Sequence, residues 1–273
     1  MQHHTQLPHP IFSFANAEMG PLASRFIRSV EKISGQPKIK KLYFDYVDDN
    51  RPAEDFWSDA LDRLGITIDL SRDVGAAIPK TGPSLIVANH PYGVIDGLVL
   101  CALVSQVRQD YKIITHRVLR QAPATIDKIL PIDFDETESA LKNNLDTRKA
   151  AEAYLRDGHA VIIFPAGAIS LAPKLVDEAF DAEWKNFAAK LATQPETVTV
   201  PFRFDGQNSV LYMAARKLSM MLGYSLMFRE IVKLMGTTVS LTMRRPIHAD
   251  ALKSIGNRKD ITRHLRRMTY GDF

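Results

Sequence analysis

Short apolar runs alternate along this chain with longer stretches in which apolar residues recur at helical spacing. Two runs, PSLIVAN at 83–89 and AVIIFP at 160–165, are apolar almost throughout, as expected of strands that are buried on both faces. Less continuous runs predict further strands at 40–47, 111–115, 128–132, 197–204 and 237–243. The run at 40–47, KKLYFDYV, is included because its apolar and polar residues alternate.

Helices are predicted between these runs. Residues 18–33 place Leu22, Phe26, Ile27, Val30 and Ile33 at helical spacing. Further helices are predicted at 53–65, 96–108, 146–156 and between 210 and 235. Strands separated by helices indicate an α/β fold, with a mostly parallel sheet covered by helices on both faces and a ligand crevice beyond the carboxyl ends of the strands.

The same pattern predicts the domain organisation. We expect residues 1–60 to form an N-terminal helical arm with the first strand, and residues 61–273 to form one globular α/β unit. The 273 residues and 45% apolar content support a sizeable core. Cys101 is the single cysteine, which excludes a disulfide framework or a multi-cysteine zinc site and favours the cytoplasm. Because it lies within the apolar helix LVLCALV, we expect a buried structural thiol.

Charge and hydropathy narrow the possible partners. No secretory signal is visible at the start of the chain, and the most apolar window, Leu85–Val104, is interrupted by polar residues, so we expect no membrane span. The net charge is +4, and basic residues are concentrated between Arg244 and Arg267. That stretch fits anionic lipid, an acidic carrier protein or a solvated helix face. It lacks interleaved aromatic residues, which argues against nucleic acid.

His90 and Asp96 are the strongest candidates for chemistry. They lie at the junction between the apolar run 83–89 and the following helix, with Pro91 and Gly93 between them to form a turn. Such a turn can bring the carboxylate back onto the imidazole and leave the other ring nitrogen free to accept a proton. A histidine that only caps a helix or packs in the core is the alternative at this point.

Three motifs in order resemble one enzyme superfamily. LIVANHPYGVIDG at 85–97, VIIFPAGAIS at 161–170 and VTVPFRF at 198–204 resemble the glycerolipid acyltransferases, typified by bacterial 1-acylglycerol-3-phosphate acyltransferase. The resemblance spans Pro83 to Ile247. It implies that His90 is a general base and Asp96 its partner. Five residues separate the two here, whereas the common form of the motif has four, so the chain is most similar to the hemolysin-like branch that includes lyso-ornithine-lipid acyltransferases.

The second motif block departs from the family pattern. The family's F-P-E-G-T-R-S aligns with Phe164, Pro165, Ala166, Gly167, Ala168, Ile169 and Ser170. The resemblance implies that this block binds substrate, and we expect the contacts from Phe164, Pro165, Ala166, Gly167 and Ser170. The family's Glu and Arg are associated with a glycerol 3-phosphate acceptor, and both are replaced here. Their loss weakens the expectation of a phosphate acceptor, because a phosphate normally requires Arg or a helix N-terminus.

The expected chemistry follows from ester formation. An alcohol must lose its proton as it attacks a thioester carbonyl, and an imidazole oriented by a carboxylate suits that task. Backbone N–H groups at Gly93 or Gly167 are candidate donors to the developing oxyanion. No G-x-S-x-G nucleophile is present, which favours direct attack without an acyl-enzyme. We expect no bound cofactor or metal, and an acyl carrier protein or coenzyme A thioester as the acyl donor.

Other candidates have weaker support. Arg117 and Arg120, and less so Arg148, are expected to hold a head group or the phosphate of the donor. We interpret the acidic residues Asp133, Asp135, Glu136 and Glu138 as an exposed loop rather than a cation site. The Met-rich stretch 210–235 fits either a lipid-facing surface or ordinary core helices.

These expectations combine into one predicted function. We predict a peripheral lipid O-acyltransferase on the inner face of the cytoplasmic membrane, which acylates the hydroxyl of a lyso-aminolipid of the ornithine-lipid type. The alternative acceptor is lysophosphatidate. A protein of a different class, which binds lipid or carrier without catalysis, is the remaining hypothesis.

Overall fold

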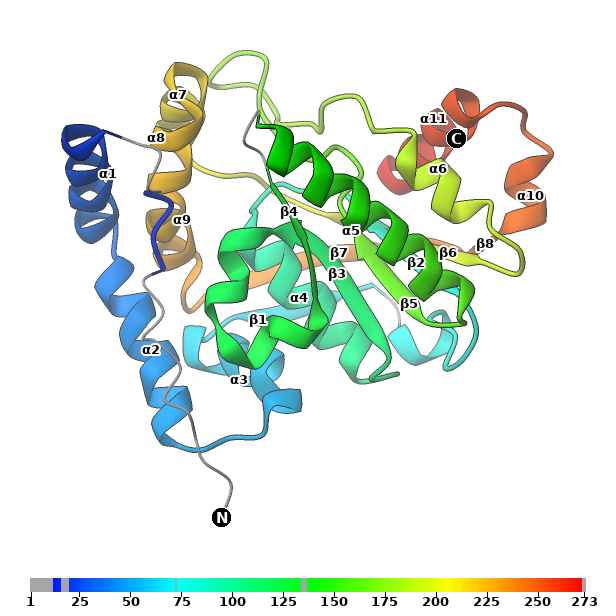
Figure 1. Cartoon of the computed structure of the whole chain (residues 1–273), viewed down its shortest axis with the longest axis horizontal. Coiled ribbons are helices and arrows are strands. Elements are labelled where there is room, and N and C mark those ends of the chain that lie inside the picture. The colour runs from blue at the N-terminus through cyan, green and yellow to red at the C-terminus, as the bar shows by residue number, and fades with distance from the viewer. Residues whose placement is uncertain (1–11, 16–19, 72, 134–136, 272–273) are drawn as a thin grey trace.

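One mixed β-sheet runs through the middle of the molecule (Figure 1). The computed structural model describes residues 12–15, 20–71, 73–133 and 137–271. Its strands are β1 (Thr67–Leu70), β2 (Ser84–Ala88), β3 (Tyr111–His116), β4 (Ile129–Ile132), β5 (Ala160–Ile163), β6 (Val198–Phe204), β7 (Thr238–Met243) and β8 (Ile247–His248). The order is β1-β7-β6-β2-β5-β3-β4, and β8 pairs with β6. Only the pairings of β6 with β7 and with β8 are antiparallel, and the other five are parallel, so the predicted mostly parallel α/β sheet is confirmed.

Helices cover both faces of this sheet (Figure 1). The helices are α1 (Pro21–Ile33), α2 (Gln36–Asp48), α3 (Phe56–Leu64), α4 (Val94–Ser105), α5 (Glu138–Arg156), α6 (Phe187–Ala192), α7 (Val210–Leu218), α8 (Met220–Ser225), α9 (Met227–Leu234), α10 (Ala249–Lys253) and α11 (Arg258–Tyr270). Short 3₁₀ helices are η1 (Ala53–Asp55), η2 (Val74–Ala76), η3 (Arg117–Gln121) and η4 (Pro123–Lys128). The N-terminal helices lie beside the α7–α9 group, because α1 packs on α8 and α2 packs on α9.

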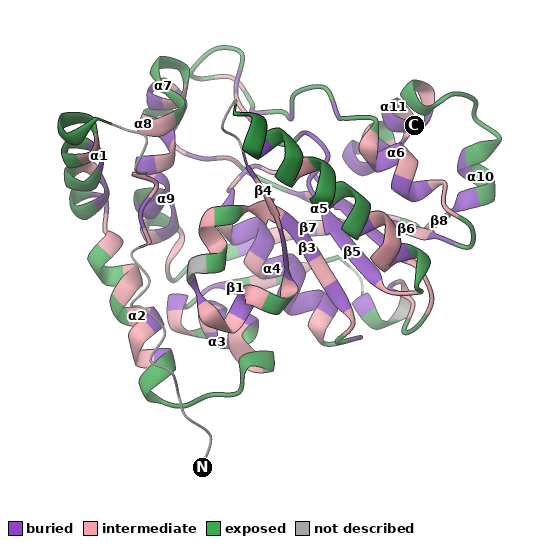
Figure 2. Cartoon of the chain, in the orientation of Figure 1, coloured by how far each residue is buried: buried purple, intermediate pink, exposed green. Residues whose placement is uncertain are grey.

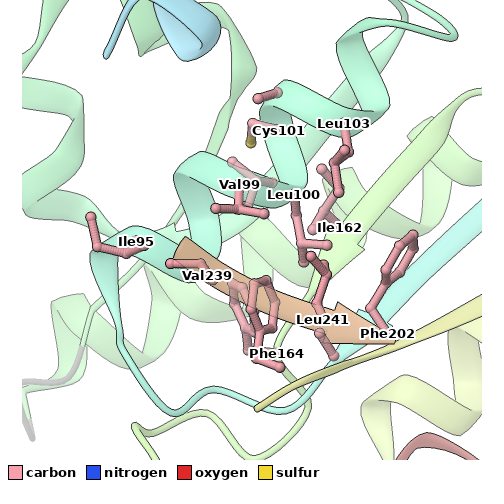
Figure 3. Close-up of a cluster of buried hydrophobic side chains, with 14 of the residues drawn as sticks. Ile95, Val99, Leu100, Cys101, Leu103, Ile162, Phe164, Phe202, Val239 and Leu241 are labelled. Atoms are coloured by element: carbon pink, nitrogen blue, oxygen red, sulfur yellow. The ribbon is translucent and has the colours of Figure 1, made fainter. Parts of the chain in front are cut away.

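The central strand β2 explains why the two layers form. Every residue of β2 is buried, and successive side chains point to opposite faces of the sheet. Ile86 and Ala88 join a cluster with α3 and α4, whereas Leu85 and Val87 join a cluster with α5, α6 and α11. Figure 2 shows the resulting buried centre, and Figure 3 shows part of the α4 cluster around Cys101. A fully buried strand therefore positions the residues that follow it at the middle of the sheet.

The strand predicted at 40–47 is wrong, because those residues lie in helix α2. Tyr43 and Tyr46, three positions apart, are both buried and pack on Phe56 at the start of α3. This spacing is helical, and the local alternation of apolar and polar residues hid it. The remaining predicted strands are confirmed. The short edge strand β1 was not predicted, since its TIDL sequence is only half-buried and resembles a loop.

The buried guanidinium of Arg108 connects several loops at the edge of the sheet where the parallel strands begin. Arg108 donates to the carbonyl oxygens of Pro79, Gly82 and Gly158, and to the carboxylate of Asp110. His159 contacts the same carboxylate at 3.0 Å. The hydrogen bond from Arg108 lowers the pKa of Asp110 to about 2.

This ion pair predicts a loss of stability in acid. Because the folded-state pKa of Asp110 is depressed, its contribution is fully present above the ordinary carboxyl pKa of about 4 and is lost as the pH falls towards 2. Urea unfolding between pH 6 and pH 2 should therefore depend less steeply on pH in Asp110→Asn than in the wild type. Asp250→Asn, which alters an exposed pair with Lys253, is the control. Equal pH dependence in wild type and Asp110→Asn would contradict this account.

Candidate active site

The register of the central strands brings the two predicted motif blocks together. Val87 of β2 pairs with Ile163 of β5, so the residues after each strand emerge side by side at the carboxyl edge. Asn89 fastens this edge to β6: its side-chain amide donates to the carbonyl of Phe204, and its carbonyl oxygen accepts from the Phe204 N–H. Sequence reasoning missed this role of Asn89, although it directly precedes the histidine.

A tight turn returns Asp96 to His90. Gly93 adopts a φ of +79°, which favours glycine, and α4 begins at the next residue. The Oδ2 atom of Asp96 then accepts three hydrogen bonds of 2.9 Å, from the backbone N–H groups of Tyr92 and Gly93 and from Nδ1 of His90. The carboxylate therefore orders the turn and the imidazole with a single oxygen.

Asp96 is completely buried. Burial raises its pKa, and the hydrogen bond from His90 is the largest effect that opposes this rise. Its second oxygen, Oδ1, has no hydrogen-bond partner in the described part of the chain. A carboxylate in such a poorly solvated position interacts strongly with a positive charge nearby. An imidazolium that forms at His90 is stabilised by this arrangement.

The imidazole ring of His90 is held by an aromatic ring as well as by Asp96. Its ring stacks on Phe164 with centroids 3.9 Å apart and an angle of 19° between the planes. The side chain is 17% exposed, and with Nδ1 bonded to Asp96 the ring directs Nε2 away from that carboxylate. The predicted pair therefore has the geometry that a general base requires: one nitrogen is oriented by a carboxylate and the other is open to a substrate.

The predicted block from Phe164 to Ser170 divides into different roles. Phe164 contacts the imidazole, and Pro165 accepts a hydrogen bond from the Lys185 N–H. The side chain of Ala166 is buried in the core with Trp184. The buried hydroxyl of Ser170 donates to Asp181.

The two candidate oxyanion donors, Gly93 and Gly167, both form hydrogen bonds within the protein. The N–H of Gly93 donates to Asp96, and the N–H of Gly167 donates to the carbonyl of Phe164 across a tight turn in which Gly167 has a φ of +69°. Both donors are therefore already used. Among the described residues of this turn, the N–H groups of Ala168 and Ile169 have no acceptor.

An apolar cavity of about 150 Å³ opens beside the first turns of α4. Its wall includes Val94 and Gly97 of α4, Met227, and the aromatic residues Tyr43 and Tyr46 of α2 and Phe56 and Trp57 of α3. The sulfur of Met227 lies 3.1 Å from the position that a Cβ on Gly93 would occupy. This contact connects the cavity with the turn that holds His90.

A second, polar cavity of about 800 Å³ lies at the carboxyl ends of β3 and β4. Both Arg117 and Arg120 line it, as do Asp133 and Tyr224. Nε of Arg117 lies 3.1 Å from the Asp133 carboxylate. Asp133 is buried, so its predicted place in an exposed acidic loop is wrong. The predicted loop residues Asp135 and Glu136 lie outside the described residues, while Glu138 begins α5.

The remaining candidates lie away from His90. Arg148 stacks over Phe187 and lines neither of these two cavities. Cys101 is buried, and burial raises the pKa of its thiol, as expected of a structural cysteine. The described residues contain no group of three or more potential metal ligands, and none of their helices is long and apolar enough to cross a bilayer.

Comparisons with known proteins agree with these features. No family model matches the chain. A lyso-glycine lipid O-acyltransferase from Phocaeicola vulgatus is 25% identical over 177 residues, which is 62% of this chain. The match spans 61% of that relative's length. The crystal structure of the 1-acyl-sn-glycerophosphate acyltransferase PlsC from Thermotoga maritima covers 92% of this chain and 87% of its own, with a TM-score of 0.50 and 16% identity.

The PlsC structure shows that the two proteins share a fold, and the sequence match includes a lipid O-acyltransferase among the chain's relatives. The matched relative and the structure with the shared fold are both described as acyltransferases that act on lipids.

Proposed function

We propose that the protein is a lipid O-acyltransferase that transfers a fatty acyl group from a thioester to the hydroxyl of a lysolipid. The observation that carries this proposal is the His90–Asp96 pair, in which Nδ1 is bonded to a buried carboxylate and Nε2 remains open. The relative from Phocaeicola vulgatus supports the reaction class. The acyl donor is an acyl carrier protein or coenzyme A thioester. The acyl group passes directly to the acceptor, without a covalent acyl-enzyme intermediate.

The geometry accounts for each step of this transfer. Nε2 of His90 takes the proton of the acceptor hydroxyl as its oxygen attacks the thioester carbonyl carbon. The imidazolium that forms is paired with Asp96 through Nδ1. When the carbon–sulfur bond breaks, the leaving thiolate takes the proton back and departs as a thiol. The N–H groups of Ala168 and Ile169, which have no acceptor within the described residues, are candidate donors for the oxyanion.

The apolar cavity beside α4 suits the acyl chain. Its lining is almost entirely hydrocarbon and aromatic, and it adjoins the Gly93 turn through Met227. An alkyl chain placed there leaves water and gains close contact with the lining. The thioester or ester group at the end of the chain then lies towards His90.

For the acceptor, we propose a lyso-aminolipid rather than lysophosphatidate. The family's Glu and Arg are replaced by Ala166 and Ile169, and the relative from Phocaeicola vulgatus is described as acting on a lyso-glycine lipid. The polar cavity offers Arg117 and Arg120 to an anionic head group. Because these arginines also suit a phosphate, lysophosphatidate remains the second candidate acceptor.

We further propose that the carboxyl edge of the sheet rests on a membrane. Most exposed apolar side chains follow strands at this edge or lie on the adjoining arm: Leu22, Phe26 and Ile33 on α1; Leu141 and Leu145 on α5; Leu175, Val176 and Phe180 after β5; and Val210, Leu211, Leu218 and Met220 on α7 and α8. Arg25, Arg28 and Lys32 are exposed on α1 as well. An apolar face flanked by cations favours the anionic inner leaflet.

This surface overlaps only in part with the predicted Met-rich stretch 210–235: Val210, Leu211, Leu218 and Met220 belong to both. Met213 and Met227 are buried in the core, and Arg216 stacks over Tyr224. The basic stretch 244–267 also lies elsewhere, because α11 packs on α6 and β6 (Figure 1).

Removal of the general base tests the mechanism. His90→Ala should lower acyl transfer by at least about a hundredfold, the effect typical of general-base removal. Asp96→Asn retains an oxygen for the Tyr92 and Gly93 N–H groups but loses the charge that stabilises the imidazolium, so it should also lose most activity. Transfer of a radiolabelled acyl group to lysolipid measures both.

Thermal unfolding serves as the control for folding of these variants. Retained transfer in folded His90→Ala would reject the general-base mechanism. If the wild type binds lysolipid by calorimetry but transfers no acyl group from any donor, the protein is a non-catalytic lipid-binding protein.

The acceptor is decided by lipid profiling of a strain that lacks the gene. We expect accumulation of a lyso-aminolipid, with normal phosphatidate, because the missing Glu and Arg weaken recognition of a phosphate acceptor. Mass spectrometry of total lipid extracts measures both pools. Accumulation of lysophosphatidate with normal aminolipid would instead identify the second candidate acceptor.

Vesicle co-sedimentation tests the membrane-facing surface. The protein should bind anionic vesicles more strongly than zwitterionic ones, and binding should weaken as salt rises, because salt screens charge over about 8 Å at physiological ionic strength. Leu22→Gln together with Phe26→Gln should weaken binding further. Val47→Gln changes an exposed apolar residue at the far end of α2 and should leave binding unchanged. Equal binding by all three proteins would refute this surface.

A further inference from the structure

Asp181 lies between the two motif blocks although neither contains it. It belongs to the segment between β5 and α6 and is 5% exposed. Its Oδ1 atom accepts from the backbone N–H of His90 at 3.1 Å and from the hydroxyl of Ser170 at 2.5 Å. Its Oδ2 atom accepts from Nε1 of Trp184 at 2.7 Å. A single buried carboxylate therefore contacts the catalytic histidine and the second motif block at once.

The backbone of His90 is held on both sides as a result. While its N–H donates to Asp181, its carbonyl oxygen accepts from the N–H of Ser170 at 2.8 Å. The imidazole is held separately, by Asp96 and by stacking on Phe164. Without Asp181, the turn between β2 and α4 keeps its contacts to Asp96 and the hydrogen bond from the Ser170 N–H, but it loses the bridge from the His90 N–H to the Ser170 hydroxyl.

The C-terminal helix completes this arrangement. The backbone N–H of Asp181 donates to the hydroxyl of Tyr270, and its carbonyl oxygen accepts from Arg266. The Tyr270 ring lies near the guanidinium groups of Arg203 and Arg266. The main chain and the side chain of Asp181 are thus both fixed, so its carboxylate is a rigid support.

We propose that Asp181 is a positioning residue for acyl transfer, which holds the His90 backbone against the Ser170 turn so that Nε2 stays aligned with the acceptor hydroxyl. This inference rests on the proposed function. A misplacement of a reacting group by about 1 Å can lower the rate by about a hundredfold. Loss of the support should therefore lower kcat, while the cavities that bind the substrates remain intact and KM stays the same.

The chemistry of the carboxylate allows a specific test. In Asp181→Asn, an oxygen can still accept from His90 and Ser170, but the amide nitrogen then faces the indole N–H of Trp184, and two donors oppose each other. Rotation of the amide instead removes the acceptor from His90. Trp184→Phe removes the opposing indole N–H, so the double variant restores an arrangement in which His90 is held.

Steady-state kinetics with acyl-coenzyme A or acyl carrier protein and a lysolipid should follow this logic. We expect a 10- to 100-fold loss of kcat in Asp181→Asn, with both KM values within about twofold of the wild type. Asp181→Asn with Trp184→Phe should regain a kcat close to that of Trp184→Phe alone. Unchanged kcat in folded Asp181→Asn, or absence of recovery in the double variant, would overturn the proposal.

Asp110→Asn is the matched control. It alters a hydrogen-bonded carboxylate at the opposite edge of the sheet, and it should lower the unfolding midpoint without changing kcat. If the Asp181 variants do not fold, Ser170→Ala removes one partner of the same oxygen. It should lower kcat several-fold with KM unchanged, and an unchanged kcat would again overturn the proposal.

Amide hydrogen exchange provides a readout that does not depend on activity. The His90 N–H should exchange at least tenfold faster in Asp181→Ala than in the wild type, and equal rates would overturn the proposal. If the wild type transfers no acyl group from any thioester donor, the proposed function is wrong. The exchange rate of the His90 N–H then still decides whether Asp181 holds the His90 backbone.

Discussion

The candidate site depends on one buried carboxylate oxygen. Oδ2 of Asp96 accepts from two consecutive backbone N–H groups and from the imidazole of His90, in a position without solvent. A buried charge is tolerated only when hydrogen bonds compensate for the water it has lost. The tight turn between β2 and α4 supplies these donors to Asp96. The orientation of His90 follows from that constraint.

The sequence was sufficient for features that depend on neighbours in the chain. The fully apolar runs at β2 and β5 predict central parallel strands, and the turn with Gly93 predicts that Asp96 returns to His90. Helix α2 was missed because its aromatic residues alternate with polar ones over a few positions, while its actual burial has helical spacing. Local patterns thus fail where tertiary packing selects one of two compatible periods.

Features that join distant segments could not be predicted in the same way. Asp181 is 91 positions from His90, and nothing in its local sequence distinguishes it from other acidic residues. The side chains of Ala166 and Ser170 belong to a motif, and they contact the core and the Asp181 carboxylate respectively. A motif identifies which backbone segment approaches the site. The direction of each side chain depends on packing.

The guanidinium of Arg108 has a consequence for how such a protein can diverge. It joins the strand connections at the amino edge of the sheet, and the candidate site lies at the carboxyl edge. Mutations in the turns around the site therefore accumulate without loss of the contacts that close the opposite edge. This separation permits substitutions in the segment from Phe164 to Ser170 while the scaffold remains folded.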